Sequence, residues 1–167
     1  MHKEELRQLL TDFAAERLAI LQRHEASARV VSHYDFNNTY QYVIAREETH
    51  LAWVHAALAE FGVAPPAAGA GLGAPEAPKG KKLQPSAFTS ILSEDARTLR
   101  AFVDRWRPRL DAMTHARHRT MLDVVLRESL EHTRLFEQGA AGDEDLLGRR
   151  TSQAERVGAV LPTRWQE

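Results

Sequence analysis

Residues 46–51 read REETHL and lie in the middle of a segment whose apolar residues recur every three or four positions. Within this stretch Glu47 and His50 are three residues apart. At about 3.6 residues per turn, their side chains lie about 60° apart around a helix and roughly one turn apart along it. A carboxylate and an imidazole at this spacing can bind one metal ion or two adjacent ions. The stretch therefore predicts a helix that carries metal ligands.

A second group of acidic and imidazole side chains follows later in the chain, at Glu128, Glu131 and His132. On a helix, the fourth residue beyond Glu128 lies about 40° from it and the third about 60° away on the other side. Either Glu131 or His132 can therefore bind a metal ion together with Glu128. Two such groups on separate helices are typical of metal sites inside helical bundles.

Apolar periodicity predicts four long helices and no sheet, so we expect an all-α fold. The first helix covers about residues 3–31, and the second begins at 34 or 35 and ends at 61, with Gly62 in the helix-ending position. The third is marked by apolar residues from Phe88 to Trp106 and is kinked or ended by Pro108, and the fourth reaches about residue 138. A short helix is also predicted at 153–160.

Residues 63–85 contain five prolines and four glycines among alanines, a composition that excludes regular structure. This segment can extend up to roughly 70 Å, which exceeds the length of a helix of roughly 40 Å. The second and third helices can therefore run parallel. We expect residues 1–140 to form a four-helix bundle with a long crossover at 63–85 between the second and third helices, followed by a polar tail at 141–167.

Composition excludes several classes of function. The 167 residues suit one domain, and a net charge of −1 predicts no general attraction to nucleic acid. The absence of cysteine excludes disulfides, thiolate metal sites and iron–sulfur clusters. The N-terminus begins directly in a charged helical pattern, and no run is long and apolar enough for a membrane span. We therefore expect a cytoplasmic protein that binds neither nucleic acid nor membrane.

Acidic residues also lie on the apolar sides of the first and third helices, at Glu16 and Asp95. A buried carboxylate is costly unless it is paired, hydrogen-bonded or bound to a cation. Since each of the four helices supplies such an acid, the pattern predicts a shared buried site. Other interpretations stay open for these two residues: Glu16 as a rim residue, and Asp95 as an acid that favours the helix dipole or pairs with a nearby arginine.

Over residues 3–138 the chain resembles the ferritin-like superfamily, which includes bacterioferritin and rubrerythrin. The resemblance rests on the segment EETHLAW at 47–53, which ends in AEFG at 59–62, and on the acid group of the fourth helix. It implies that a carboxylate from the first and third helices and a Glu-x-x-His from the second and fourth bind two metal ions. The implied metal ligands are Glu16, Glu47, His50, Asp95, Glu128 and either Glu131 or His132.

The resemblance implies two iron ions, with manganese or a mixed manganese–iron pair as the variant that an oxygen-rich fourth helix favours. The implied chemistry is that of an oxidase, peroxidase or ferroxidase acting on dioxygen, peroxide, ferrous iron or a small-molecule substrate. A homodimer is compatible with the sequence. Two departures from the family pattern stand out: Asp95 is shorter than the usual glutamate, and Glu131 takes the position of the expected histidine.

Two alternatives to the dimetal oxidoreductase stay open. The sequence therefore does not decide whether the chain is an enzyme. One is a ferritin-like bundle that has lost its metal and serves as a structural or interaction protein. The other is a DinB-like bundle that binds a metal through three histidines, suggested by the run HLAW at 50–53. The second alternative requires paired histidines on another helix that face His50.

Overall fold

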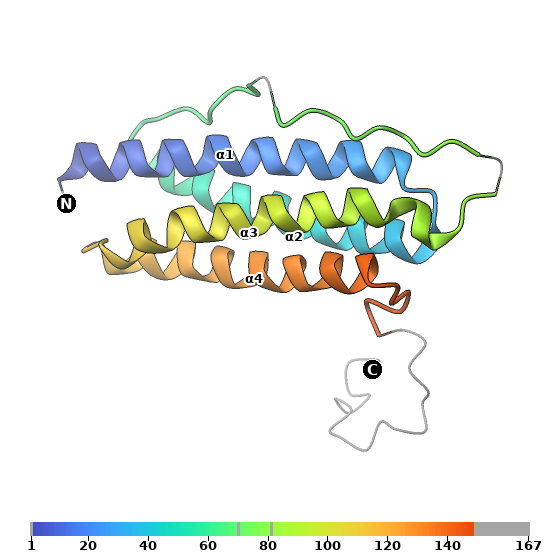
Figure 1. Ribbon diagram of the computed structural model, residues 1–167. Coiled ribbons are helices and arrows are strands. Elements are labelled where there is room, and N and C mark those ends of the chain that lie inside the picture. Colours follow the sequence, from blue (N-terminus) through green and yellow to red (C-terminus); the bar gives the residue numbers. More distant parts are fainter. Residues whose placement is uncertain (1, 70, 81, 149–167) are drawn as a thin grey trace, which may run out of the picture.

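The computed structural model describes residues 2–69, 71–80 and 82–148 and consists of four long helices (Figure 1). These are α1 (Lys3–Val30), α2 (Tyr34–Ala59), α3 (Thr89–Asp111) and α4 (Ala116–Ala140), with a short 3-10 helix η1 (Pro85–Phe88) before α3. No strand occurs within the described ranges, which confirms the all-α prediction. None of the described helices is both long and apolar enough to cross a membrane.

Local signals in the sequence explain where the helices end. Gly62 follows α2 with φ of 71°, a left-handed conformation that glycine adopts without strain. Between α1 and α2, the side-chain amide of Asn37 donates hydrogen bonds to the carbonyls of Ala28 and Val31, at 2.7 and 3.0 Å. Pro108 does not end α3, which continues to Asp111. The short helix predicted at 153–160 lies outside the described residues.

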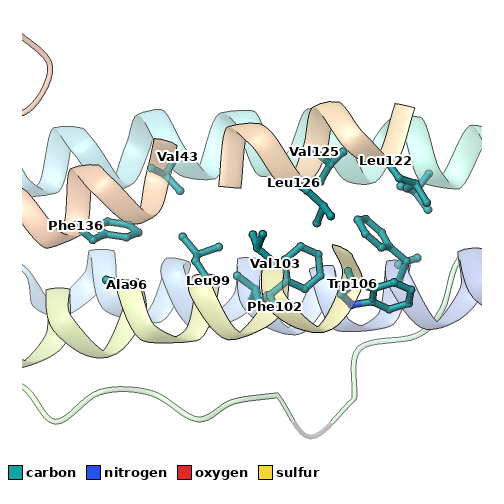
Figure 2. Packing of buried hydrophobic residues seen from close by; sticks show 14 of the residues in the cluster. Val43, Ala96, Leu99, Phe102, Val103, Trp106, Leu122, Val125, Leu126 and Phe136 are labelled. Carbon is teal, nitrogen blue, oxygen red and sulfur yellow. The ribbon is translucent and has the colours of Figure 1, made fainter. Parts of the chain in front are cut away.

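The helices pack most extensively in two pairs, α1 with α2 and α3 with α4, and these pairs enclose one apolar core. Each helix contributes a stripe of buried residues at alternating steps of three and four, the spacing of a helix that faces a bundle interior. Figure 2 shows part of this core, in which Leu99 and Val103 point from α3 toward the helices opposite. The rings of Phe102 and Trp106 instead lie against Phe13 of α1, with centroids 5.2 and 4.8 Å away.

The connection from α2 to η1 has no regular structure in its described residues, which are 60–69, 71–80 and 82–84, and these run beside α1 over the length of the bundle (Figure 1). Val63 and Leu83, near the two ends of this connection, pack against the core. Near its middle, the carbonyl of Gly73 accepts a hydrogen bond from Arg23 Nη1 on α1 at 3.3 Å. The connection is thus held to α1 by a polar contact and to the core at both ends.

Candidate functional site: a buried cluster of charged side chains

Between Phe13 and His24, the inward stripe of α1 contains two charged or polar residues among apolar ones. Phe13, Arg17, Ile20 and His24 follow one another at steps of four, three and four, and all four are buried. The guanidinium of Arg17 lies over the ring of Phe102 on α3, at 5.5 Å from its centroid. Arg17 therefore points into the bundle interior, not toward solvent.

Arg17 and His24 converge on Glu47, which α2 places in its own inward stripe. Glu47 Oε1 lies 3.3 Å from Arg17 Nη2, and both side chains are fully buried. The Nδ1 atom of His24 lies 3.0 Å from Glu47 Oε1 and 2.9 Å from Oε2. Arg17 Nη2 also lies 3.1 Å from Nδ1 of His50, one turn further along α2. The predicted pair Glu47 and His50 thus meets a cation from α1.

The fourth helix joins this group through Glu128. His50 Nε2 lies 2.9 Å from Glu128 Oε2, and Arg46 donates to both carboxylate oxygens, at 2.9 Å from Nε and 2.7 Å from Nη2. The ring of His132 stacks against that of His50 with centroids 6.4 Å apart. We call these seven residues the central cluster: Arg17, His24, Arg46, Glu47, His50, Glu128 and His132.

The protonation states in the central cluster follow from burial and from the arginines. Burial lowers the pKa of His50 to about 4, and the positive charge of Arg17 acts in the same direction. Burial also lowers the pKa of His132 to about 4, although the nearby charge of Glu47 opposes this. Both imidazoles are therefore neutral at pH 7.

The two carboxylates remain ionised. Burial raises the pKa of Glu47, but the charges of His24 and Arg17 more than offset this effect, so that its pKa is lowered overall. The hydrogen bonds from Arg46 lower the pKa of Glu128. The guanidinium groups of Arg17 and Arg46 match the two carboxylates in charge, and the charge of His24 that acts on Glu47 adds to the positive side, so the carboxylates are compensated without any added cation.

Asp95 lies in a separate buried group with α1 and α2, which we call the Asp95 cluster. Its Oδ1 accepts a hydrogen bond from Arg23 Nε at 2.8 Å. Its Oδ2 accepts from Ser27 Oγ at 2.7 Å and from the Tyr40 hydroxyl at 2.6 Å. Tyr40 precedes Glu47 by seven residues, or about 10 Å along a helix. Asp95 is therefore at a different level of the bundle from the central cluster.

Glu16 and Glu131, two of the predicted ligands, make contacts elsewhere. Glu16 is partly exposed between α1 and α3, where it accepts hydrogen bonds from Arg105 and, at 2.7 Å, from the indole nitrogen of Trp106. Glu131 is exposed and pairs with Arg134 on its own helix at 3.1 Å. The structure thus brings together Glu47, His50, Glu128 and His132, and separates them from Glu16, Asp95 and Glu131.

The central cluster does not fit two metal ions in this arrangement. Within the described ranges, the one group of three or more His, Asp or Glu residues whose ligand atoms lie within 4.8 Å of one another is elsewhere, at His33, Asp35 and Glu144. In the central cluster, the Arg17 guanidinium touches both Glu47 and His50, where a cation bound by that pair would be. A metal ion there would face a buried like charge.

The three-histidine alternative also finds little support in the positions of the imidazoles. The α4 histidine that His50 faces is His132. The pair His115 and His118 forms a separate contact, with Nδ1 atoms 2.8 Å apart. His118 lies against Phe61, beyond the C-terminal end of α2 and three turns from His50. The three histidines that a DinB-like metal site requires therefore do not lie together.

Sequence reasoning missed the α1 residues of both clusters, which are Arg17, Arg23, His24 and Ser27. A signal for three of them was present. Arg17, His24 and Ser27 continue the steps of three and four that begin at Leu10 and Phe13, so the periodicity that predicts the core also places these side chains inside it. Glu16 is one position off this stripe, which explains its exposure.

Comparisons of this chain with protein-family models, with curated proteins and with solved structures gave no match.

Proposed function

We propose that this protein is a ferritin-like four-helix bundle whose interior is neutralised by its own arginines, and that it acts by association as an interaction protein, not by dimetal chemistry. The observation that carries the proposal is the position of Arg17, fully buried between Glu47 and His50. A buried guanidinium supplies there the positive charge that metal ions supply in a dimetal site.

The ferritin-like part of the proposal is supported by the path of residues 60–84. A connection that returns over the length of the bundle fits helices α2 and α3 that run in the same direction, as a crossover bundle requires. Glu47 and His50 on α2, opposite Glu128 and His132 on α4, also match the places at which that family binds metal. The acids that would complete such a site from α1 and α3 are instead bound to Arg105, Trp106, Arg23, Ser27 and Tyr40.

The association part of the proposal is supported by aromatic side chains that α2 exposes. Tyr42 and Trp53 are 47% and 36% exposed, and their rings contact His132 and His50 of the central cluster. Between them lies the partly exposed pair of Arg46 and Glu128. A two-fold dimer needs one self-complementary surface, and a face with aromatic rings and one charge of each sign meets this need. A second copy of the chain is therefore the partner we propose for this face.

Metal analysis tests the proposal directly. Protein purified without added metal is expected to contain no iron or manganese that depends on Glu47 or Glu128. The variant Arg17→Gln removes the buried cation and leaves an excess of negative charge, so it is expected to gain affinity for Fe²⁺ or Mn²⁺. Near-stoichiometric iron in the wild-type protein that is lost in Glu47→Gln and Glu128→Gln would overturn the proposal.

Sedimentation measures the association. The wild-type chain is expected to dimerise, and the double variant Tyr42→Ser/Trp53→Ser to be monomeric with unchanged helix content. Leu72→Ser is the matched control, because Leu72 is a large exposed apolar residue in the connection between α2 and η1. A wild-type chain that stays monomeric at high concentration contradicts the proposed dimer.

A second candidate is the dimetal oxidoreductase that the resemblance implies. It is favoured by imidazole nitrogens without partners: His24 Nε2 and His132 Nδ1 are buried without a hydrogen-bond partner in the described part of the chain. Two atoms of Arg17, Nε and Nη1, also lack partners there, so movement of this side chain would break few contacts. Oxygen consumption by iron-loaded protein, lost in Glu47→Gln, would favour this candidate.

A further inference from the structure

Three potential metal ligands meet at the end of the bundle where α1 turns into α2. His33 precedes α2, Asp35 is in its first turn, and Glu144 follows α4. Each offers one ligand atom, and the three atoms lie within 4.8 Å of one another. His33 Nε2 is 3.1 Å from Glu144 Oε2, and all three residues are partly buried. The group contains an imidazole as well as carboxylates, which distinguishes it from a purely acidic surface patch.

A cavity of about 10 Å³ adjoins this group. It is lined by Asp35, Asn38, Glu144 and Asp145 together with the side chains of two leucines. A volume near this value holds about one water-sized sphere, and therefore one ion. Besides Asp35 and Glu144, this space is therefore bordered by the amide-bearing residue Asn38 and by a further acidic residue, Asp145.

We propose that His33, Asp35 and Glu144 bind a single divalent transition-metal ion, of the class of Zn²⁺ or Mn²⁺. Imidazole nitrogen combined with carboxylate oxygen suits these ions, whereas Ca²⁺ and Mg²⁺ prefer oxygen alone. The bound ion replaces the proton that joins His33 Nε2 to Glu144 Oε2. Water or the side-chain carbonyl of Asn38 completes the coordination.

This site links parts of the chain that are far apart in sequence. Glu144 lies 111 residues beyond His33, in the segment that follows α4 and that packs onto the core through Leu146. An ion bound by both His33 and Glu144 connects residues 141–148 to the turn between α1 and α2. Metal binding therefore stabilises the folded chain, because the ligands come together only in the folded state.

The experiment is calorimetric titration of metal-free, tag-free protein with ZnCl₂ and, separately, with MnCl₂, together with thermal unfolding at each metal concentration. One ion per chain is expected, with a rise in Tm. His33→Ala and Glu144→Gln are expected to weaken binding at least about tenfold. Glu131→Gln, an exposed carboxylate on α4, is the matched control and is expected to bind as the wild type does.

Two results would overturn the site: no binding of either ion by the wild-type chain at millimolar concentration, or equal binding by wild type, His33→Ala and Glu144→Gln. The variants also separate this inference from the proposed function. Metal lost in Glu47→Gln but kept in Glu144→Gln belongs to the bundle centre and contradicts both proposals. Metal lost only in His33→Ala and Glu144→Gln supports the end site and leaves the proposed function intact.

Discussion

Arg17 on α1 and Glu47 on α2 form an ion pair, with Nη2 and Oε1 3.3 Å apart, in which neither side chain is exposed to solvent. Removing one partner of a buried pair leaves the other charge uncompensated, at a cost of about 3–5 kcal/mol. We predict that Arg17→Met lowers the free energy of unfolding by this amount. Urea denaturation measures the change.

The double variant Arg17→Met/Glu47→Met is the control for this prediction. Because both charges are gone, the double variant is expected to recover most of the lost stability, as apolar replacements of buried ion pairs do in other proteins. If Arg17→Met is as stable as the wild type, the guanidinium is not buried against Glu47 and the central cluster is wrongly described.

The hydroxyl of Tyr40 donates a hydrogen bond of 2.6 Å to the buried carboxylate of Asp95. Bonds to charged groups are worth about 1.5–3 kcal/mol, so Tyr40→Phe is expected to lower the free energy of unfolding by about that much. Tyr42→Phe is the matched control, since Tyr42 is 47% exposed two positions away. Equal stability of the two variants would show that the Tyr40 bond contributes nothing.

Stability is predicted to fall as the pH is lowered from about 6.5 to about 4. The pKa of His50 and that of His132 are about 4 in the folded chain, below the ordinary value of 6.5. In this window the unfolded imidazoles take up protons while the folded ones do not, so protonation favours the unfolded state. The loss is up to about 3 kcal/mol for each imidazole. The lowered pKa of Glu47 acts in the same direction at the acidic end, because its protonation weakens the folded state.

Urea denaturation at a series of pH values measures this dependence. His132→Gln is expected to make the dependence on pH shallower, since one of the two titrating groups is then absent. His2→Gln, at an exposed N-terminal position, is expected to leave the slope unchanged. A free energy of unfolding that stays constant or rises between pH 6.5 and 4 is the outcome that contradicts buried, neutral imidazoles.

Gly139 on α4 is packed so closely that an added side chain would crowd its neighbours. A Cβ atom there would lie 3.1 Å from Leu146 Cδ1 and 3.2 Å from Leu92 Cδ1. Alanine in place of a helical glycine stabilises by about 1 kcal/mol, but crowding in a core costs about 1–3 kcal/mol. We predict that Gly139→Ala is destabilising by about 1 kcal/mol in thermal or urea unfolding.

The background variant Leu146→Ala provides the control, because it removes one of the two atoms that crowd the new methyl group. In that background, Gly139→Ala is expected to be neutral or stabilising. If Gly139→Ala stabilises the wild-type chain, as it would at an uncrowded helical position, residues 141–148 do not pack on α4 as described.

The periodicity of single helices predicted much of the fold and part of the site. The four helices, the ends of α2 and the inward positions of Glu47, His50 and His132 follow from steps of three and four residues. The same steps place Arg17 inside the bundle as well, although the predicted ligand set contained only carboxylates and imidazoles. Glu16 and Glu128 lie one position off the inward stripes, and both are partly exposed in the structure.

The sequence by itself determined which side of each helix is buried, because side-chain direction depends only on position along one helix. Only the tertiary structure decided which buried groups meet, because that depends on how far each helix is shifted along its neighbours. Asp95 therefore pairs with Arg23 and Tyr40, two turns from Glu47, although both acids were predicted at one level. The meeting of His33 with Glu144 likewise depends on where α4 ends relative to the turn between α1 and α2, which side-chain packing sets and local spacing does not.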